Sequence, residues 1–408
     1  MNNQVPIPGC PTIRALAFNE SGVIEVIESD VRRPGIARVV EKWGDPDSSK
    51  SVVAASLTDG NVNRLLVVAR SNSEIEFRNP RNGETHFTKT CDSCDPIVGL
   101  HVFTNCVSEL DSTRCCKLLT CTEQGNAKID RYIVETGQSI GYSTWTVSES
   151  CHILCSQVHV DEEYSIFGGD HAGLYKCDLE AGQTIWTAPL HYLWPPRISC
   201  TSAAFRSRGN HHLLVAGSNI HDVSFYDTRG PSPTHQVIDL FLKKPGLVAT
   251  PIRAIVAGPD ENTIYIGTDS GDIFSLDLRT GNAAYFSGIS IGSHRFTNFN
   301  YDHSPIAFSG SIRFLARHHE HPLLASAGDN CVNIWDINKA RQIAKVIVDN
   351  NLSNVIFDHN SYGEADQSHA EEKGGDGGPE AKGGGDGGPK MKVYERKRKA
   401  TQSPNYRR

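Results

Sequence analysis

Residues 311–348 hold four short apolar runs separated by polar turns, and this segment limits the possible fold more than any other part of the chain. The runs cover residues 312–316, 323–327, 332–337 and 343–348. Gly328-Asp329-Asn330 supplies a tight turn between the second and third runs, and the third run contains Trp335-Asp336. This pattern is typical of one four-stranded antiparallel blade of a WD-repeat β-propeller. Because a blade buries its faces only against neighbouring blades, we expect further copies in the chain.

Degenerate copies of this unit do occur. In each copy the third run ends in an apolar or aromatic residue, followed by an acidic or amide residue and a turn that usually closes with Gly. The markers of this position are Asn79, Ile133, Asp178, Asp227, Asp277 and Asp336. They are 54, 45, 49, 50 and 59 residues apart, longer than the usual WD period of ~40–45, so several loops carry insertions. The markers define six units between residues 51 and 348.

A seventh blade can be assembled from the two ends of the chain. Residues 12–18, 22–28 and 37–42 supply three strands, and residues 353–357 supply the fourth. Pairing the ends in one blade closes the ring and removes free sheet edges. We therefore predict an all-β fold, a seven-bladed WD-repeat β-propeller over residues 1–363, closed by pairing of the N- and C-terminal strands. Six blades with an N-terminal appendage is the alternative.

The last part of the chain has a different composition. Residues 364–389 are rich in Gly, contain GGDGGP twice and carry a net charge of −5, whereas residues 390–408 carry +7. Since the whole chain carries −7, residues 1–363 carry −9. A Gly- and Pro-rich segment cannot bury a core, so we predict a disordered linker and basic tail over residues 364–408. The basic cluster is typical of a nuclear import signal or a nucleic-acid contact, and a merely solubilising end is the alternative.

The rest of the composition places the chain inside the cell. No apolar stretch approaches the ~18 residues that a membrane span needs, and the N-terminal text has no secretory signal pattern. We expect a cytosolic or nuclear protein, in which the 12 cysteines stay reduced. Most of them fall in predicted strands, where a free cysteine behaves as a small buried hydrophobe.

Three patterns suggest chemistry, and each has a simpler explanation. Ser290 lies in a GxSxG match, but no helix pattern follows it, as a hydrolase would require. Cys91 and Cys94 form one CxxC, but no second ligand pair follows at zinc spacing. His321-Pro322 occupies the turn between the first two strands of its blade, as in many WD repeats. We therefore expect no catalytic activity, no metal, no cofactor and no small-molecule substrate, and a binding role carried by loops.

Three stretches resemble one known family. They are residues 8–18 (PGCP…RALAF) together with 39–47 (VVEKWGDPD), then 266–281 (IGTDSGDIFSLDLRTG) and 311–330 (SIRFLA…HPLLASAGDN). With the basic C-terminus, they are similar to the nucleolar WD-repeat factors of large ribosomal subunit biogenesis, in a plant-type version. The resemblance implies a propeller on pre-ribosomal large-subunit particles, in the nucleus and nucleolus, that contacts other assembly factors and ribosomal RNA or protein. It also implies release by a hexameric AAA-type ATPase. The GGDGGP repeats depart from the family pattern.

A binding role of another class remains open. Asp227-Thr228-Arg229 and Asp277-Leu278-Arg279 fit the Asp-x-Arg ending by which some WD proteins dock onto cullin-RING ubiquitin ligases as substrate receptors. The simpler explanation is that each Asp caps its turn while the Arg is a solvated rim residue.

The candidate contact residues fall in two groups. Aromatic and charged residues in predicted loops are the types that recur at interaction hot spots, although the tryptophans could instead pack between blades. The partner-binding candidates are Trp43, Asp45, Trp194, Arg197, Arg279 and Arg295. The nuclear import or RNA-contact candidates are Lys390, Lys392, Arg396, Lys397, Arg398 and Lys399.

Overall fold

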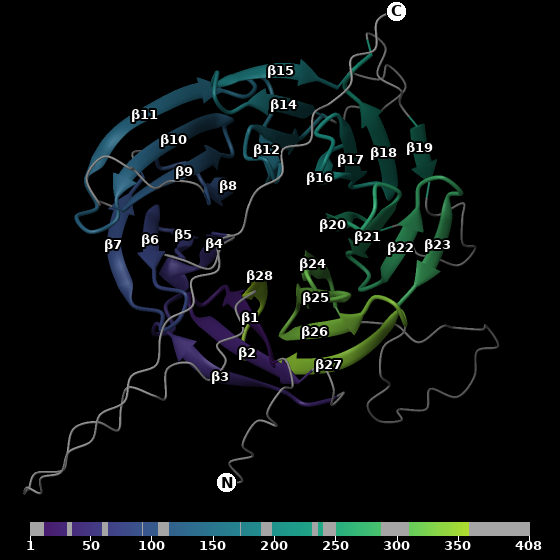
Figure 1. Cartoon of the computed structure of the whole chain (residues 1–408), viewed down its shortest axis with the longest axis horizontal. Coiled ribbons are helices and arrows are strands. Elements are labelled where there is room, and N and C mark those ends of the chain that lie inside the picture. The colour runs from purple at the N-terminus through teal and green to yellow at the C-terminus, as the bar shows by residue number, and fades with distance from the viewer. Residues whose placement is uncertain are drawn as a thin grey trace, which may run out of the picture. The chain divides into compact units, whose positions relative to one another are not determined.

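A computed structural model describes ten segments of the chain, which cover residues 12–30, 35–58, 64–91, 93–104, 114–171, 173–188, 198–230, 236–239, 250–286 and 310–358. Within these segments the strands form seven antiparallel sheets of four strands each, arranged as a ring (Figure 1). The predicted seven-bladed propeller is therefore confirmed, and the six-blade alternative is wrong. The ring belongs to a unit of residues 1–361, and the predicted tail, residues 364–408, lies outside the described residues.

Each blade is numbered here by its place along the chain and listed from its innermost to its outermost strand. Blades 1 to 3 are β4 (Val52–Leu57), β5 (Leu66–Arg70), β6 (Glu74–Arg78), β7 (Thr85–Thr90); β8 (Ile97–Val102), β9 (Cys115–Thr122), β10 (Asn126–Ile133), β11 (Ser139–Thr146); and β12 (Ile153–Val158), β13 (Tyr164–Gly169), β14 (Leu174–Asp178), β15 (Gln183–Thr187). Blades 4 to 6 are β16 (Cys200–Phe205), β17 (Leu213–Ser218), β18 (Asp222–Asp227), β19 (Gln236–Asp239); β20 (Ile252–Ala257), β21 (Thr263–Thr268), β22 (Ile273–Asp277), β23 (Asn282–Tyr285); and β24 (Ile312–Arg317), β25 (Leu323–Gly328), β26 (Cys331–Asp336), β27 (Arg341–Ile347). Blade 7 is β28 (Leu352–Asp358), β1 (Thr12–Asn19), β2 (Ile24–Asp30), β3 (Ala37–Trp43).

The second strand of a blade is covered on both faces, because the neighbouring blades pack against it. Its residues are therefore mostly apolar or small, and every residue of β5 and β25 is buried. Arg70, at the end of β5, is buried because it pairs with Glu76 at 2.7 Å. Small residues make room for the first side chain of the next inner strand. A Cβ atom on Gly217 would lie 2.5 Å from Cγ2 of Ile252, and one on Gly267 would lie 2.6 Å from Cγ2 of Ile312. Such close approach between blades explains why these positions are glycine.

The turns explain the repeated sequence markers. The side chains of Asp178 and Asp277 each accept a hydrogen bond from the backbone N–H two residues later, at 2.9 and 2.8 Å. Each turn then closes with a residue at positive φ, which is Gly182 at +61° and Gly281 at +67°. Glycine adopts this backbone conformation without steric cost. The marker therefore records a turn geometry that several blades share.

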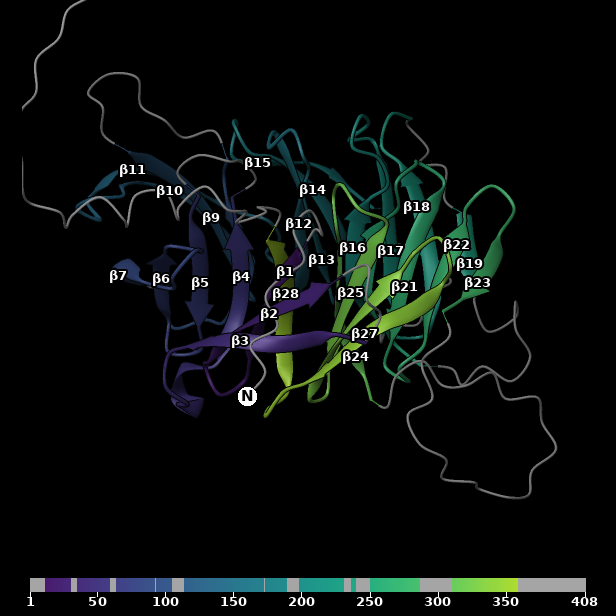
Figure 2. The same cartoon turned by 60° about the horizontal axis from the view of Figure 1, so that its bottom comes forward.

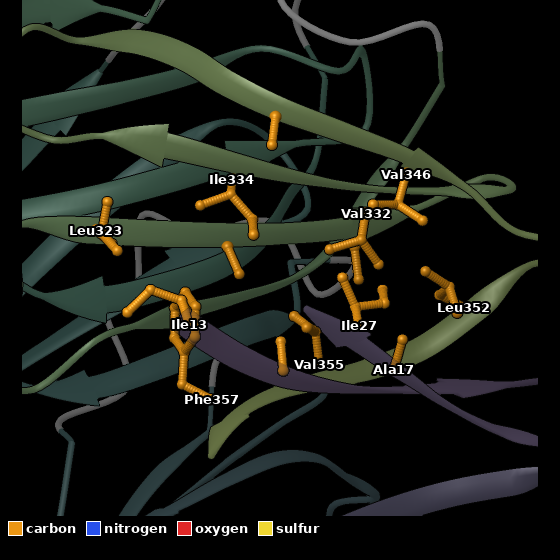
Figure 3. Packing of buried hydrophobic residues seen from close by; sticks show 14 of the residues in the cluster. Ile13, Ala17, Ile27, Leu323, Val332, Ile334, Val346, Leu352, Val355 and Phe357 are labelled. Atoms are coloured by element: carbon orange, nitrogen blue, oxygen red, sulfur yellow. The ribbon is translucent and has the colours of Figure 1, made fainter. Parts of the chain in front are cut away.

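Blade 7 contains both ends of the described chain. β28 pairs antiparallel with β1, so that Leu16 is opposite Ile356 and Ala17 is opposite Val355. Figure 3 shows the buried side chains of blades 6 and 7 packed together, including Leu352, Val355 and Phe357 from β28. The predicted pairing of the terminal strands is therefore confirmed.

A buried ion cluster joins blade 7 to blade 1. The Asp358 side chain is fully buried and pairs with the guanidinium of Arg64, which lies just before β5. Nη1 of Arg14, on β1, lies 3.7 Å from Oδ2 of the same carboxylate, and Nη2 of Arg14 donates to the carbonyl of Arg81 at 3.1 Å. Buried charges of this kind require such partners, so this cluster fixes the position of the closing strand.

The strands cross the thickness of the ring, so turns and loops gather on its two faces (Figure 2). One face carries the starts of the inner strands and the turns between second and third strands. The other face carries the ends of the inner strands. No helix in the described segments is long and apolar enough to cross a membrane.

Candidate functional site

A cleft of about 1050 Å³ lies on the face where the inner strands begin. Its apolar floor is formed by the second residues of three inner strands, Val53 on β4, Val98 on β8 and Leu154 on β12. Val53 and Leu154 are 37% and 41% exposed. The rim comes from the loops before β4, β8 and β28, from two turns and from Ser353, the second residue of β28. Its polar residues are Glu20, Ser21, Ser48, Ser51, Asn330, Asp349, Asn350, Asn351 and Ser353. An apolar floor inside a hydroxyl, amide and carboxylate rim suits a polypeptide segment.

The charges of the rim are largely compensated within the ring itself. Nζ of Lys42 lies 2.7 Å from Oδ2 of Asp349 and 3.1 Å from Oε1 of Glu25. The hydrogen bonds to Asp349 and Glu25 raise the pKa of Lys42 above its usual value. Arg313 pairs with Glu20, and its Nη2 lies 3.6 Å from Oδ1 of Asp329. Because each acid has a nearby cation, the cleft offers hydrogen bonds and apolar area rather than a strong field for a charged ligand.

The loop between β3 and β4 forms one wall of the cleft. It contains the short 3-10 helix η1 (Ser48–Lys50), whose N-cap is Asp47. Oδ1 of Asp47 accepts hydrogen bonds from the backbone N–H of Ser49 at 2.9 Å and from its hydroxyl at 2.6 Å, and these bonds lower the pKa of Asp47. The predicted contact residue Asp45 is exposed in this loop, so its side chain is accessible to a partner.

Trp43 is not an exposed loop residue, and the prediction that it is exposed was wrong. It is the last residue of β3 and is only 7% exposed. A Cβ atom on Gly83 of blade 1 would lie 2.3 Å from Cδ2 of the indole, which shows how closely the two blades approach there. The Trp43 Nε1–H donates to Oε2 of Glu41 at 3.0 Å. Trp43 therefore packs between blades, as the alternative interpretation held, and supports the loop that follows it.

Both Asp-x-Arg sequences have the geometry of a capped turn. The Arg229 guanidinium pairs with Asp227, and Nη2 of Arg279 lies 3.5 Å from Oδ2 of Asp277. The hydrogen bond from Arg279 N–H lowers the pKa of Asp277, and the bonded side chain of Arg229 lowers that of Asp227 to about 2. The side chains of Arg229 and Arg279 are 57% and 70% exposed. Each Asp is thus occupied by its own turn, while each Arg is accessible at the rim.

The remaining predicted contact residues lie outside the described segments, and so does Ser290. They are Trp194, Arg197, Arg295, Lys390, Lys392, Arg396, Lys397, Arg398 and Lys399. Among the residues that are described, no group of three or more His, Cys, Asp or Glu side chains could hold a metal ion.

The histidine-rich turn between β24 and β25 confirms the interpretation of residues 318–322. Nδ1 of His318 accepts hydrogen bonds from the backbone N–H groups of Glu320 and His321, at 3.2 and 3.1 Å. The ring of His318 is buried and lies edge-on to Phe357, with 5.1 Å between ring centroids. His318 is therefore a turn residue that also packs against the closing strand.

A smaller hollow of about 560 Å³ lies on the opposite face, where the inner strands end. Its lining mixes the cations Arg206, Arg208 and Arg317 with the acids Glu162, Asp260 and Glu261. Burial lowers the pKa of both Arg206 and Arg317. Because its volume is smaller and its lining contains six charged side chains, this hollow is the weaker candidate for a polypeptide site.

A buried polar cluster between blades 3 and 4 was not anticipated from the sequence. Lys176, on β14, is 1% exposed, and its Nζ lies 2.7 Å from Nδ1 of His211 and 4.5 Å from the ring centroid of Tyr164. Burial lowers the pKa of Lys176 to about 8, and burial together with the Lys176 charge lowers that of His211 to about 4. The one sequence signal is a lysine two residues before the marker Asp178, at a position that is Phe77, Phe225 or Ile334 in three other blades. We assign this cluster to packing between blades.

The comparisons with known proteins assign neither a family nor a function to the chain. No protein-family model matches the chain, and no curated protein matches it significantly. The case for a function therefore rests on the cleft and on the motifs of the sequence.

Proposed function

We propose that this protein is a non-catalytic scaffold in the assembly of the large ribosomal subunit, acting in the nucleus and nucleolus. The observation that carries the proposal is the cleft above Val53, Val98 and Leu154, which provides a docking site for a polypeptide on a rigid ring. The resemblance of three sequence stretches to large-subunit biogenesis factors supplies the biological setting.

The charge distribution of the chain suggests different binding partners for the ring and the tail. Residues 1–363 carry −9 and residues 390–408 carry +7. An acidic ring is repelled by bare RNA, so we propose that it docks on assembly factors through protein contacts, within pre-ribosomal large-subunit particles. The tail then supplies the nuclear import signal and whatever RNA affinity exists. By the same resemblance, an AAA-type ATPase is the proposed partner for release.

Depletion followed by rescue tests this function. Depletion is expected to reduce free large subunits relative to small ones and to accumulate precursor rRNA of the large-subunit branch. Wild-type chain should restore the ratio, whereas the double variant Val53→Glu, Leu154→Glu should not, because two carboxylates would occupy the apolar floor. Ile185→Glu is the matched control, since Ile185 is 45% exposed on the outer strand β15 and lies outside the cleft. Rescue by the double variant would show that the cleft is not needed for assembly of the large subunit.

The alternative function, substrate receptor of a cullin-RING ubiquitin ligase, is favoured by the exposure of Arg229 and Arg279. Under the scaffold proposal, Arg229→Ala and Arg279→Ala should rescue the depleted cells fully. The alternative instead predicts that depletion leaves the ratio of large to small subunits unchanged and abolishes ubiquitylation of a specific set of proteins. That result would contradict the scaffold function and support the ligase-receptor function.

A further inference from the structure

The outer strand of blade 2 has an unusual surface. β11 is an edge strand, with β10 as its one partner among the described strands, and Figure 1 shows it on the rim of the ring. It is eight residues long, and all of them except the half-buried Trp145 are exposed. Ile140 and Tyr142 are 50% and 71% exposed. A long, exposed edge strand presents unpaired backbone groups that can accept another strand.

The other outer strands lack this combination of length and neutrality. β3, β7 and β27 carry Lys or Arg residues, such as Lys42, Lys89 and Lys345. β15 is uncharged but has five residues, β23 has four, and β19 has four and contains Asp239. Charged residues and short length are the usual means by which an edge strand avoids pairing. β11, with the sequence SIGYSTWT, has neither.

The register shows which backbone groups of β11 point outward. Val147 N–H donates to the carbonyl of Gly125 at 2.8 Å, just beyond the end of the β10–β11 pair. Because hydrogen-bonded and non-bonded pairs alternate along an antiparallel ladder, the residues opposite Asn126, Lys128 and Asp130 do not bond to β10. These are Thr146, Thr144 and Tyr142. Their N–H and C=O groups therefore face away from the ring.

The Tyr142 side chain is held in place beside this edge. Nζ of Lys128 lies 5.1 Å from the ring centroid of Tyr142 and 3.1 Å from Oδ2 of Asp130. The ring therefore rests on its own sheet, and less conformational freedom is lost when a second strand packs against it.

We propose that β11 is a dimerisation edge, which pairs antiparallel with β11 of a second copy of this chain. A two-fold axis at Ser143 places the outward N–H and C=O groups of Tyr142 opposite those of Thr144 in the second copy. The same axis places those of Thr144 opposite Tyr142 of the second copy. This register pairs an aromatic with a β-branched residue twice, which is favourable in antiparallel sheets. Since β11 carries no charge, self-pairing brings no like charges together. A two-fold contact of this kind closes on itself and forms a dimer.

The size of the contact predicts a weak, reversible dimer. One pair of eight-residue strands buries less than the ~1,200 Å² of stable interfaces, so we expect a dissociation constant on the order of 10–100 μM. Sedimentation of the full-length chain should show a weight-average mass that rises from that of one chain towards twice that value across this range. A mass that stays at one chain up to several hundred micromolar would overturn the proposal.

A pair of matched proline variants tests the edge itself. Thr144→Pro removes an outward N–H that forms no hydrogen bond to the described strands, so the variant should fold normally and stay monomeric. Thr88→Pro is the control: Thr88 on β7 is opposite Glu76, and Cys91 N–H donates to the carbonyl of Ser73, which is the same register on the neighbouring blade. This control should dimerise like the wild type. Equal effects of the two prolines would contradict pairing through β11.

Charge variants at Ser143 test the two-fold register. Ser143→Lys and Ser143→Glu each place like charges opposite one another, so each variant alone should be monomeric. An equimolar mixture should form a heterodimer, because opposite charges then meet across the axis. Failure of the mixture to associate would refute the register. Wild-type chain that stays monomeric but binds an extended segment of another protein along β11 would assign this edge to a different partner.

Discussion

Closure of the ring by β28 leads to a strong prediction about truncation. A chain that ends at Ile347 lacks β28 and with it the buried side chains of Leu352, Val355 and Phe357, which are 0%, 0% and 2% exposed. Full burial of an aliphatic or aromatic side chain contributes roughly 1.5–3 kcal/mol, so these three account for roughly 5–9 kcal/mol. Domains have a total unfolding free energy of roughly 5–15 kcal/mol. We therefore expect residues 1–347 to be insoluble or to melt far below the intact ring.

The comparison requires a control that also lacks the tail. Residues 1–361 form one compact unit that retains β28 and the Asp358 ion cluster. Thermal unfolding by circular dichroism should give the 1–361 chain the same midpoint as the full chain, with a large drop or no cooperative transition for 1–347. Equal midpoints for the two truncated chains would refute the claim that β28 holds the ring closed.

Other parts of the ring and tail lead to further predictions. Gly217→Val should lower the free energy of unfolding in urea by about 1–3 kcal/mol, because the new side chain overlaps Ile252. Gly209→Ala is the control and should be neutral, since nothing lies within 4 Å of its Cβ. Equal stability of the two variants would contradict the packing between blades. Burial of Lys176 lowers its pKa from 10.5 to about 8, so between these values the unfolded chain binds more protons and the free energy of unfolding rises with pH. This rise, about 1–3 kcal/mol, should be absent in Lys176→Met, and identical pH profiles would refute it. Replacing Arg396, Lys397, Arg398 and Lys399 with Ala should move a tagged chain out of the nucleus without changing its melting temperature, and undiminished nuclear accumulation would count against the import signal. Residues 1–363 should bind RNA more weakly than the full chain, by a margin that shrinks as salt rises; equal affinities would exclude the tail as the RNA contact.

The architecture could be predicted because several blades use the same turn. Asp277 and Gly281 recur at matching positions in several blades, since a capped turn and a positive φ are required each time. The closing blade followed from the need to remove free edges, although residues 12–18 and 353–357 are far apart in the sequence. A local geometry that is repeated along the chain can therefore be detected from the repeated residues of one sequence.

The candidate site could be predicted only in part, because its environment is built from distant residues. The sequence around Trp43 does not show that Gly83 lies against its ring. The cleft combines Val53, Val98 and Leu154, which are about fifty residues apart in the sequence and become neighbours only when blades 1 to 3 pack side by side. The low pKa of Lys176 has the same origin, since it results from burial of the side chain by residues that are distant in the sequence. The neutrality of β11 was visible in the sequence, but its place at an edge was not.

The proposed docking of the ring on pre-ribosomal particles is tested most directly by affinity purification of the tagged full-length chain, with and without RNase. If the account is right, assembly factors of the large subunit co-purify in similar amounts after RNase treatment, because the acidic ring binds them through protein contacts. The Val53→Glu, Leu154→Glu variant should lose at least one of these factors, while Ile185→Glu retains them all. Recovery of a cullin-RING ligase core in place of large-subunit factors would contradict the account.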